Sequence, residues 1–261
     1  PVTADIKAGG SDGPISITYG GSSTISWTSA NATSCSVTKN GSAFSSGLSN
    51  AGTSSGALTT TTTFTQSCSG PGGSASNSVE VRVLTMSLSA SPNSGNAPLN
   101  GVSITATVVG TSSGTYRYFV DCTNNGSNEV DSGDISSNPY TASGACSYPS
   151  AGTYTVFVTV WHNQGLATAT AIITVSAPPP VTADIKAGGS DGPISITSGG
   201  SSTISWTSTN ATSCSVTKNG SAFSSGTSNA GTSSGALTTT TTFTQSCSGP
   251  GGSASNSVEV R

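Results

Sequence analysis

The sequence predicts an all-β protein of three small β-sandwiches in tandem, arranged as an elongated rod. Short runs of alternating apolar and polar residues, typical of half-buried strands, are separated by glycine-rich turns. No window shows the periodicity of an amphipathic helix. Residues 1–82 recur almost unchanged as residues 180–261, which indicates a repeat architecture.

The repeat defines the predicted domains. We expect repeat domain A at residues 1–82, a different domain B at residues 83–177, and a second copy of A at residues 178–261. The copies differ only at three positions, which we expect to lie at the surface or in loops: Tyr19/Ser198, Ala30/Thr209 and Leu48/Thr227. Because both copies begin and end in phase, we expect further repeats of the same array as partners.

Within domain A, the period-2 runs predict strands near residues 15–18, 24–27, 35–37, 64–68 and 79–81. Asn40-Gly41 predicts a type I′ hairpin, because both residues tolerate positive φ. In domain B the same pattern predicts strands near residues 116–120, 154–160 and 168–175.

The two domain connections favour an extended arrangement. Residues 79–83 run almost directly into residues 84–88, and Pro178-Pro179-Pro180 favours a semi-rigid polyproline spacer. Three sandwiches placed end to end would span about 110–130 Å.

Composition excludes several classes of function. Charged residues make up 7% of the chain, where about 25% is typical. The net charge of -3 comes without a basic stripe, which argues against a nucleic-acid partner. No apolar run approaches the roughly 20 residues of a membrane span. Six cysteines without CxxC or metal-ligand spacing indicate disulfides and an extracellular or cell-surface location; the alternative is buried free thiols.

We find no catalytic constellation and predict no enzymatic activity and no cofactor. The single histidine, His162, is expected in a solvated turn with Asn163. Several acidic and amide side chains gather in one stretch of domain B, namely Asp121, Asn125, Glu129, Asp131 and Asp134. A solvated loop is the simpler interpretation, and a Ca²⁺ site is the alternative, since Ca²⁺ prefers such oxygen ligands.

The tryptophans divide into two kinds. Trp27 and Trp206 lie in phase with Ile25 and Ile204, which predicts core positions. Trp161 follows a strand and is expected to be partly exposed, with a carbohydrate contact as the alternative. Five asparagines match the N-glycosylation sequon: Asn31, Asn40, Asn125, Asn210 and Asn219.

Domain B resembles a PKD domain, an immunoglobulin-like sandwich. The resemblance is carried by SGNAPL at residues 94–99, YPSAGTYTV at residues 148–156 and GLATA at residues 165–169. Domain B departs from the family at residues 120–126, VDCTNNG, where a WDFGDG-like turn is usual. The resemblance implies the sandwich fold and a bacterial surface or secreted protein.

Domain A is similar to bacterial immunoglobulin-like repeats. The similarity lies in GSSTISW at residues 21–27, NATSC at residues 31–35, LTTTTTF at residues 58–64, Cys68, and GGSAS at residues 72–76. It implies a spacer or adhesive module of a large prokaryotic cell-surface protein.

The disulfide pairing follows from the repeat, because each domain contains two cysteines. We predict three bridges: Cys35–Cys68, Cys122–Cys146 and Cys214–Cys247. Immunoglobulin strand order implies that the A-domain cysteines lie on strands C and F, which are neighbours in one sheet.

These features together predict a non-catalytic, extracellular structural or adhesive segment, a stalk or filament of a prokaryotic cell surface. Its predicted partners are further repeats, neighbouring chains in a filament or surface layer, and a glycan or other cell-surface ligand. The rival hypothesis is an accessory, glycan-binding region of a secreted hydrolase.

Overall fold

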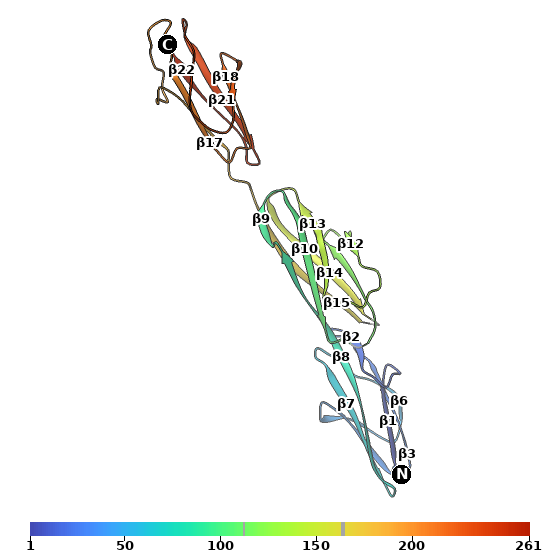
Figure 1. Cartoon of the computed structure of the whole chain (residues 1–261). Helices are drawn as coiled ribbons and strands as arrows, with labels where there is room; N and C mark the ends of the chain where they lie inside the picture. The colour runs from blue at the N-terminus through green and yellow to red at the C-terminus, as the bar shows by residue number, and fades with distance from the viewer. Residues whose placement is uncertain (112, 163–164) are drawn as a thin grey trace. The chain divides into compact units, whose positions relative to one another are not determined.

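The computed structural model describes residues 1–111, 113–162 and 165–261, and these residues contain strands but no helix. The all-β prediction is therefore confirmed. The chain divides into two compact units, Pro1–Val175 and Ser176–Arg261, which are described one at a time (Figure 1).

The first sandwich of unit 1 contains the first copy of domain A. Its strands are β1 (Thr3–Ala8), β2 (Ile15–Thr18), β3 (Thr24–Ala30), β4 (Ser34–Lys39), β5 (Ser42–Ser46), β6 (Asn50–Ser54), β7 (Thr62–Gly70) and the first part of β8 (Gly73–Ser91). One sheet has the order β1-β3-β6, and the other β5-β4-β7-β8. β2 adds to β8 in parallel, whereas the other pairs are antiparallel. This is the strand arrangement of an immunoglobulin-like sandwich.

The core of this sandwich lies between the two sheets. Trp27, Phe64 and Ile25 are almost completely buried there, as their period-2 spacing predicted. The indole Nε1 of Trp27 donates to the Gly47 carbonyl at 3.0 Å, so the polar edge of the ring is satisfied inside the core.

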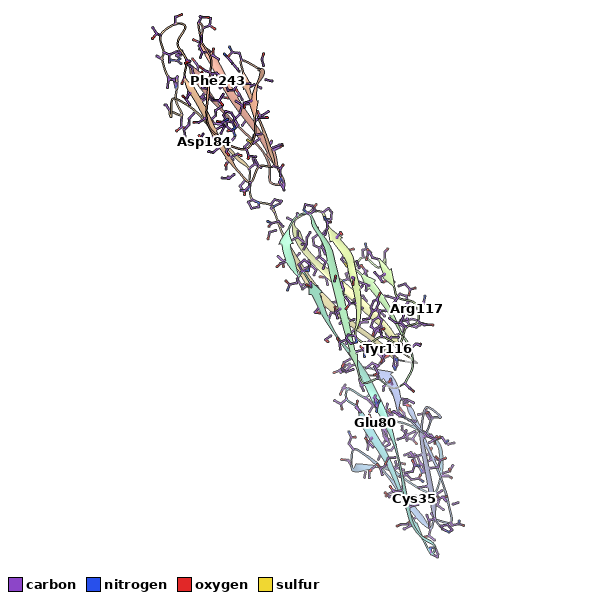
Figure 2. All side chains as sticks on the ribbon, in the orientation of Figure 1. Cys35, Glu80, Tyr116, Arg117, Asp184 and Phe243 are labelled. Carbon is purple, nitrogen blue, oxygen red and sulfur yellow. A yellow bond between two sulfur atoms is a disulfide. The ribbon has the colours of Figure 1, made fainter. Side chains whose placement is uncertain are left out.

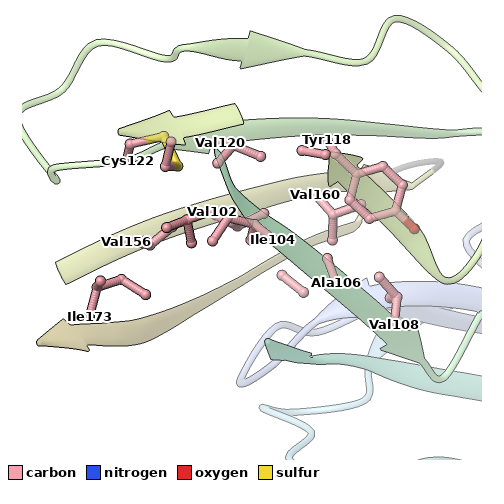
Figure 3. Close-up of a cluster of buried hydrophobic side chains, with 14 of the residues drawn as sticks. Val102, Ile104, Ala106, Val108, Tyr118, Val120, Cys122, Val156, Val160 and Ile173 are labelled. Atoms are coloured by element: carbon pink, nitrogen blue, oxygen red, sulfur yellow. A yellow bond between two sulfur atoms is a disulfide. The ribbon is translucent and has the colours of Figure 1, made fainter. Parts of the chain in front are cut away.

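The second sandwich of unit 1 is domain B. It is built from the second part of β8 together with β9 (Ser94–Asn96), β10 (Leu99–Val109), β11 (Tyr116–Asp121), β12 (Val130–Asp131), β13 (Tyr140–Tyr148), β14 (Gly152–His162) and β15 (Gly165–Ser176). The order β13-β10-β8 forms one sheet and β12-β11-β14-β15-β9 the other. Valines and isoleucines from both sheets, such as Val102, Ile104 and Val156, meet in the core (Figure 3).

A tyrosine corner stabilises the entry into β14. The Tyr154 hydroxyl donates to the Ser150 carbonyl at 2.9 Å, the local backbone contact typical of immunoglobulin-like sandwiches. This contact lies within the YPSAGTYTV stretch.

Strand β8 belongs to both sandwiches of unit 1 (Figure 1). Val83 packs in the core of the first sandwich, and the next residue, Leu84, packs in the core of domain B. Successive side chains of a strand point to opposite faces. One strand can therefore serve two cores, and the predicted boundary after Arg82 falls inside this strand.

Unit 2 contains the second copy of domain A. Its strands are β16 (Thr182–Ala187), β17 (Thr203–Thr209), β18 (Ser213–Lys218), β19 (Ser221–Ser225), β20 (Asn229–Ser233), β21 (Thr241–Gly249) and β22 (Gly252–Val260). Its sheets, β16-β17-β20 and β19-β18-β21-β22, repeat those of the first copy. The counterpart of β2 is reduced to a single parallel bridge between Ile194 and Val260.

Local predictions for domain A are also confirmed. Asn40 and Gly41 have φ of 49° and 81° and connect the paired residues Lys39 and Ser42, as a type I′ turn requires. All three differing positions are at the surface, with Tyr19 62% and Leu48 45% exposed. Ala30 is also exposed.

Candidate functional site

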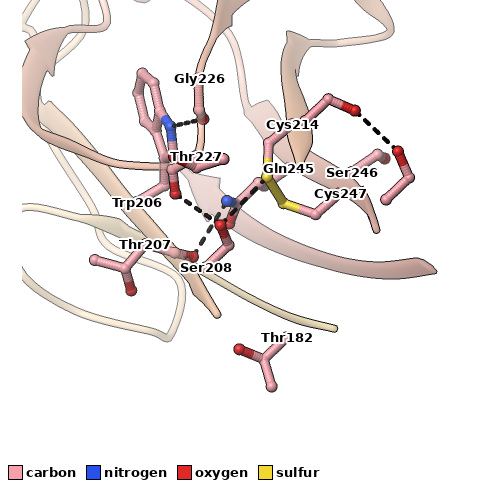
Figure 4. Close-up of a disulfide and its surroundings, with 12 residues drawn as sticks. Thr182, Trp206, Thr207, Ser208, Cys214, Gly226, Thr227, Gln245, Ser246 and Cys247 are labelled. Atoms are coloured by element: carbon pink, nitrogen blue, oxygen red, sulfur yellow. Dashed lines mark hydrogen bonds between the residues drawn. A yellow bond between two sulfur atoms is a disulfide. The ribbon is translucent and has the colours of Figure 1, made fainter. Parts of the chain in front are cut away.

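The structure contains the three predicted disulfides. In the first A copy, Cys35 on β4 lies directly opposite Cys68 on β7, with the Cα atoms 4.1 Å apart. Cys214 and Cys247 repeat this arrangement in unit 2 (Figure 4). The bridge thus links neighbouring strands of one sheet, as the immunoglobulin strand order implied.

The disulfide of domain B is placed differently. Cys122 follows β11 and Cys146 lies on β13, so this bridge joins the two sheets of the sandwich. The Tyr148 hydroxyl donates to the Cys122 carbonyl at 3.0 Å, which fixes the backbone beside the bridge. Burial raises the pKa of Tyr148 to about 12, with a further contribution from Glu129.

The expectation of a solvated turn for His162 is wrong. His162 ends strand β14 and is fully buried. Its Nδ1 lies 2.9 Å from the Thr115 carbonyl oxygen, and its ring stacks on Tyr116 at 4.4 Å between centroids. Period 2 places residue 162 on the same inward face as Val160 and Val158. Asn163, expected in the same turn, lies outside the described residues.

Asp121 organises the loop that follows β11. It is buried, and its carboxylate accepts backbone N–H groups from Thr123, Asn125 and Gly126. Burial works against ionisation of Asp121, but these hydrogen bonds together hold its pKa below the usual value. The Asn125 side chain accepts the Ser127 N–H. Asp121 and Asn125, two of the five Ca²⁺ candidates, thus shape this loop through contacts with its backbone.

The other acidic candidates also have protein partners. Asp131 forms a two-pronged ion pair with Arg117, with N–O distances of 2.9 and 2.6 Å. Arg117 follows Tyr116 on strand β11 (Figure 2). The Arg117 hydrogen bond, followed by the Gly133 N–H, lowers the pKa of Asp131 to about 2. Glu129 accepts the Cys122 N–H at 2.6 Å.

Asp134 is exposed, and its charge lies close enough to contribute to the raised pKa of Arg117. Across residues 1–111, 113–162 and 165–261, no group of three His, Cys, Asp or Glu side chains is arranged to hold a metal ion. Ca²⁺ binding by the five candidates stays a prediction.

The predicted sequon asparagines are all exposed: Asn31, Asn40, Asn125, Asn210 and Asn219. Asn40 lies at the tip of a hairpin, where its Oδ1 accepts the Thr63 N–H and an attached sugar would face solvent. Glycosylation of these sites stays a prediction.

The two kinds of tryptophan are separated as predicted. Trp27 and Trp206 are 1% exposed, whereas Trp161 on β14 is 60% exposed. Trp161 lies on the outer face of domain B's five-stranded sheet, with its ring 6.4 Å from the ring of Phe119 in an edge contact. The Arg117 guanidinium lies 5.3 Å from the centre of the Phe119 ring, so a cation and two aromatic rings share this face.

Strand register extends this surface toward the first sandwich. Trp161 pairs with Arg117 on β11 and with Leu166 on β15, so the three form one row across the sheet. Phe119 and Thr168 flank Thr159 in the next row. We call these two rows the Trp161 face.

The Trp161 face ends at a groove of about 380 Å³ between the two sandwiches of unit 1. The groove is lined by residues 166–168 of β15, by residues 84–86 of β8, and by Thr18 and Tyr19 of the first sandwich. Among the described residues, no charged side chain lines it. Sequence reasoning identified Trp161 but missed Tyr19 and Leu166, because only the meeting of two domains brings them together.

Within the described ranges, the structure has no apolar helix of membrane-spanning length. No protein-family model matches the chain, and no curated protein matches it.

Several solved structures are similar to the chain. The I-band fragment I67-I69 from titin has a TM-score of 0.40 and 15% identity, covering 100% of this chain and 98% of that one. The three N-terminal domains of the bacteriophage RB49 Highly Immunogenic Outer Capsid protein have a TM-score of 0.37 and 11% identity, with 100% and 99% covered. Fibronectin(III)-like modules of Clostridium thermocellum CbhA have a TM-score of 0.28 and 15% identity, with 66% and 94% covered. The immunoglobulin-like assignment rests on the strand order within each sandwich.

Proposed function

We propose that this chain is a non-catalytic structural segment of an extracellular, prokaryotic cell-surface protein, in which domain B is a PKD-like module between two A modules. Its role is to hold attached parts at a distance, as a stalk or filament. Three disulfides support an oxidising location outside the cell.

The observation that carries this proposal is the junction inside unit 1. Strand β8 passes without a break from the first sandwich into domain B. A bend at this point would break the backbone pairing of residues 81–84 with β2. A flexible linker has no such pairing to lose, so this connection resists bending.

Three side-chain hydrogen bonds reinforce the junction. The Ser16 hydroxyl donates to the Gly110 carbonyl at 3.0 Å, and the Leu166 N–H donates to the Thr18 hydroxyl at 2.9 Å. Arg82 donates to the Thr111 carbonyl while its Nε pairs with Glu80. These contacts connect the end of the first sandwich to two separate parts of domain B.

Two glycines permit this close approach. Gly110 has φ of 79°, and a Cβ there would collide with the Val83 carbonyl. A Cβ at Gly165 would collide with the Leu84 side chain and approach the backbone of Ile17. Side chains at these two positions would push the domains apart.

Small-angle X-ray scattering of the whole chain tests the proposal. A compact chain of 261 residues would have a radius of gyration of about 18 Å, whereas a rod of about 110–130 Å should exceed about 30 Å. A value near 20 Å would remove the physical basis of the stalk role.

A matched pair of variants tests the junction itself. Gly165→Ala should increase hydrogen exchange at residues 15–18, because the added methyl group separates β2 from domain B. Gly152→Ala is the control, since its added Cβ meets only ordinary contacts of 3.6 Å or more. Equal exchange in both variants would contradict a close-fitting junction.

A further inference from the structure

We propose that the groove between the first A copy and domain B, together with the Trp161 face, binds a neutral oligosaccharide. This inference goes beyond the structural role, because a stalk needs the junction but does not need an exposed aromatic surface beside it.

Trp161 lies exposed on the surface of domain B. A side chain that is 60% exposed leaves a large apolar ring in water, although the core of domain B lies one residue away on the same strand. The ring is nevertheless held in place, because Phe119 contacts its edge and Leu166 is its cross-strand neighbour. A ring held on a rigid sheet loses little conformational entropy when a ligand stacks on it.

The lining of the groove is chemically mixed. It combines apolar side chains, such as Leu166 and Met86, with Thr18, Thr85 and Thr168. Sugar rings also combine apolar C–H faces with hydroxyl edges. A protein partner would favour a continuous apolar patch with a polar rim.

The groove has no charged lining. In the part of the chain that the structure describes, no acidic or basic residue lines it. The charged residue in the Trp161 row, Arg117, is already paired with Asp131. A charged ligand would have no counter-ion here, so the site fits a neutral chain.

Tyr19 also lines the groove and is 62% exposed, so it offers a second ring with a hydroxyl group.

The site in unit 1 combines residues of two domains. Tyr19 comes from the first A copy, and Trp161 comes from β14 of domain B. At the position of Tyr19, the second A copy has Ser198. The second copy therefore supplies a natural replacement for testing the role of Tyr19.

Isothermal titration calorimetry on the whole 261-residue chain tests this site. The probes are cellohexaose, maltohexaose, chitohexaose and mannohexaose, with a hyaluronan hexasaccharide as the anionic comparison. We expect at least one neutral probe to bind and the anionic one to bind more weakly. Trp161→Ala should weaken that binding at least tenfold, and Trp161→Phe should recover part of it, because stacking of about 1.4 kcal/mol corresponds to tenfold in Kd.

Two further variants locate the site. Tyr19→Ser, which places the residue of the second copy in the first, should weaken binding about threefold to tenfold. Ile172→Ala is the matched control: it removes a similarly exposed apolar side chain, 55% exposed, from the same face of β15. Ile172 lies about 20 Å from Leu166 along the strand, so this variant should bind as the parent does.

The inference is overturned if no neutral probe binds below about 10 mM, if Trp161→Ala binds as the parent does, or if the anionic probe binds best. Such a result leaves the structural role intact, since scattering and hydrogen exchange at the junction report on that role separately.

Discussion

The two copies of domain A have nearly the same sequence but different structures at one end. In the first copy, residues 15–18 form a full parallel strand against β8, and Ser16 and Ile17 are buried. In the second copy the same tetrapeptide makes one parallel bridge, Ile194–Val260, with backbone hydrogen bonds from Ile194 and Ile196 to Glu259 and Arg261. Ser195 is exposed, and Ile196 is only partly buried.

The pairing of residues 15–18 in the first copy reaches beyond the repeat. β8 continues past Arg82 into domain B, and Ile17 and Thr18 pair with Val83 and Leu84. Two of the four pairs of this short strand therefore involve residues that follow domain A.

Cavity-forming substitutions of the buried tryptophans test whether the two cores are equivalent, and they should have the largest effect on stability. Trp27→Ala and Trp206→Ala should each lower the unfolding free energy of their own copy by about 3–5 kcal/mol, because each leaves a large cavity. Hydrogen exchange on peptides that include residue 19 or 198 distinguishes the copies by mass. If the two losses of unfolding free energy differ by more than about 1 kcal/mol, the neighbouring domains affect the stability of the core.

Loss of the disulfide should also affect both copies equally. Each bridge spans 33 residues. In the chain-entropy model, replacing both cysteines of one bridge with alanine should lower the free energy of unfolding of that copy by about 3–4 kcal/mol. Chemical denaturation of the two double variants measures this loss. A much smaller loss in one copy alone would show that its unfolded state is already restricted.

The third prediction targets the difference itself. Ile17→Ala should lower the free energy of unfolding by about 2 kcal/mol or more, because Ile17 is 8% exposed and packs in the first core. Ile196→Ala should cost less than about 1 kcal/mol, since its side chain already contacts solvent. Equal losses in thermal unfolding would show that the pairing of Ile17 with Val83 adds no stability.

A surface ion pair that both copies share should have the smallest effect on the free energy of unfolding. The hydrogen bond from Lys7 lowers the pKa of Asp12, and that from Lys186 lowers the pKa of Asp191. A lowered folded-state pKa stabilises the protein above the unfolded value of about 3.9, and this contribution is lost as the pH falls below it. The effect should be slight because both pairs are exposed.

Carboxyl chemical shifts followed by NMR check this last expectation. Both aspartates should titrate below the usual value, and Lys7→Met should return Asp12 to it while leaving Asp191 unchanged. A normal pKa for either aspartate in the parent chain would show that the pair does not form in solution.

Much of this architecture was predictable from local sequence. Strand positions such as 35–37 and 64–68 follow from period 2, and the hairpin at Asn40-Gly41 follows from the conformational tolerance of those residues. The disulfide pairing followed from the repeat. These features depend on residues close in sequence or on counting, so no tertiary information was needed.

Two features of domain B were not predicted from the sequence. Strand β10 (Leu99–Val109) was not predicted, and His162 was assigned to a turn. His162 is buried because the preceding strand extends two residues further than its apolar residues suggested, which places the imidazole against Tyr116. A polar side chain can occupy a core when a carbonyl and an aromatic ring receive it, and sequence alone does not reveal those partners.

Local pattern and repetition were enough to predict the all-β class, the A–B–A order, the disulfides and the division between buried and exposed tryptophans. Neither could reveal that β8 is shared by two cores or that Tyr19 and Leu166 line the same groove. The physical reason is distance along the chain. Alternation of side chains reports which face of a strand is buried, but a contact between residues 19 and 166 depends on how two folded domains meet.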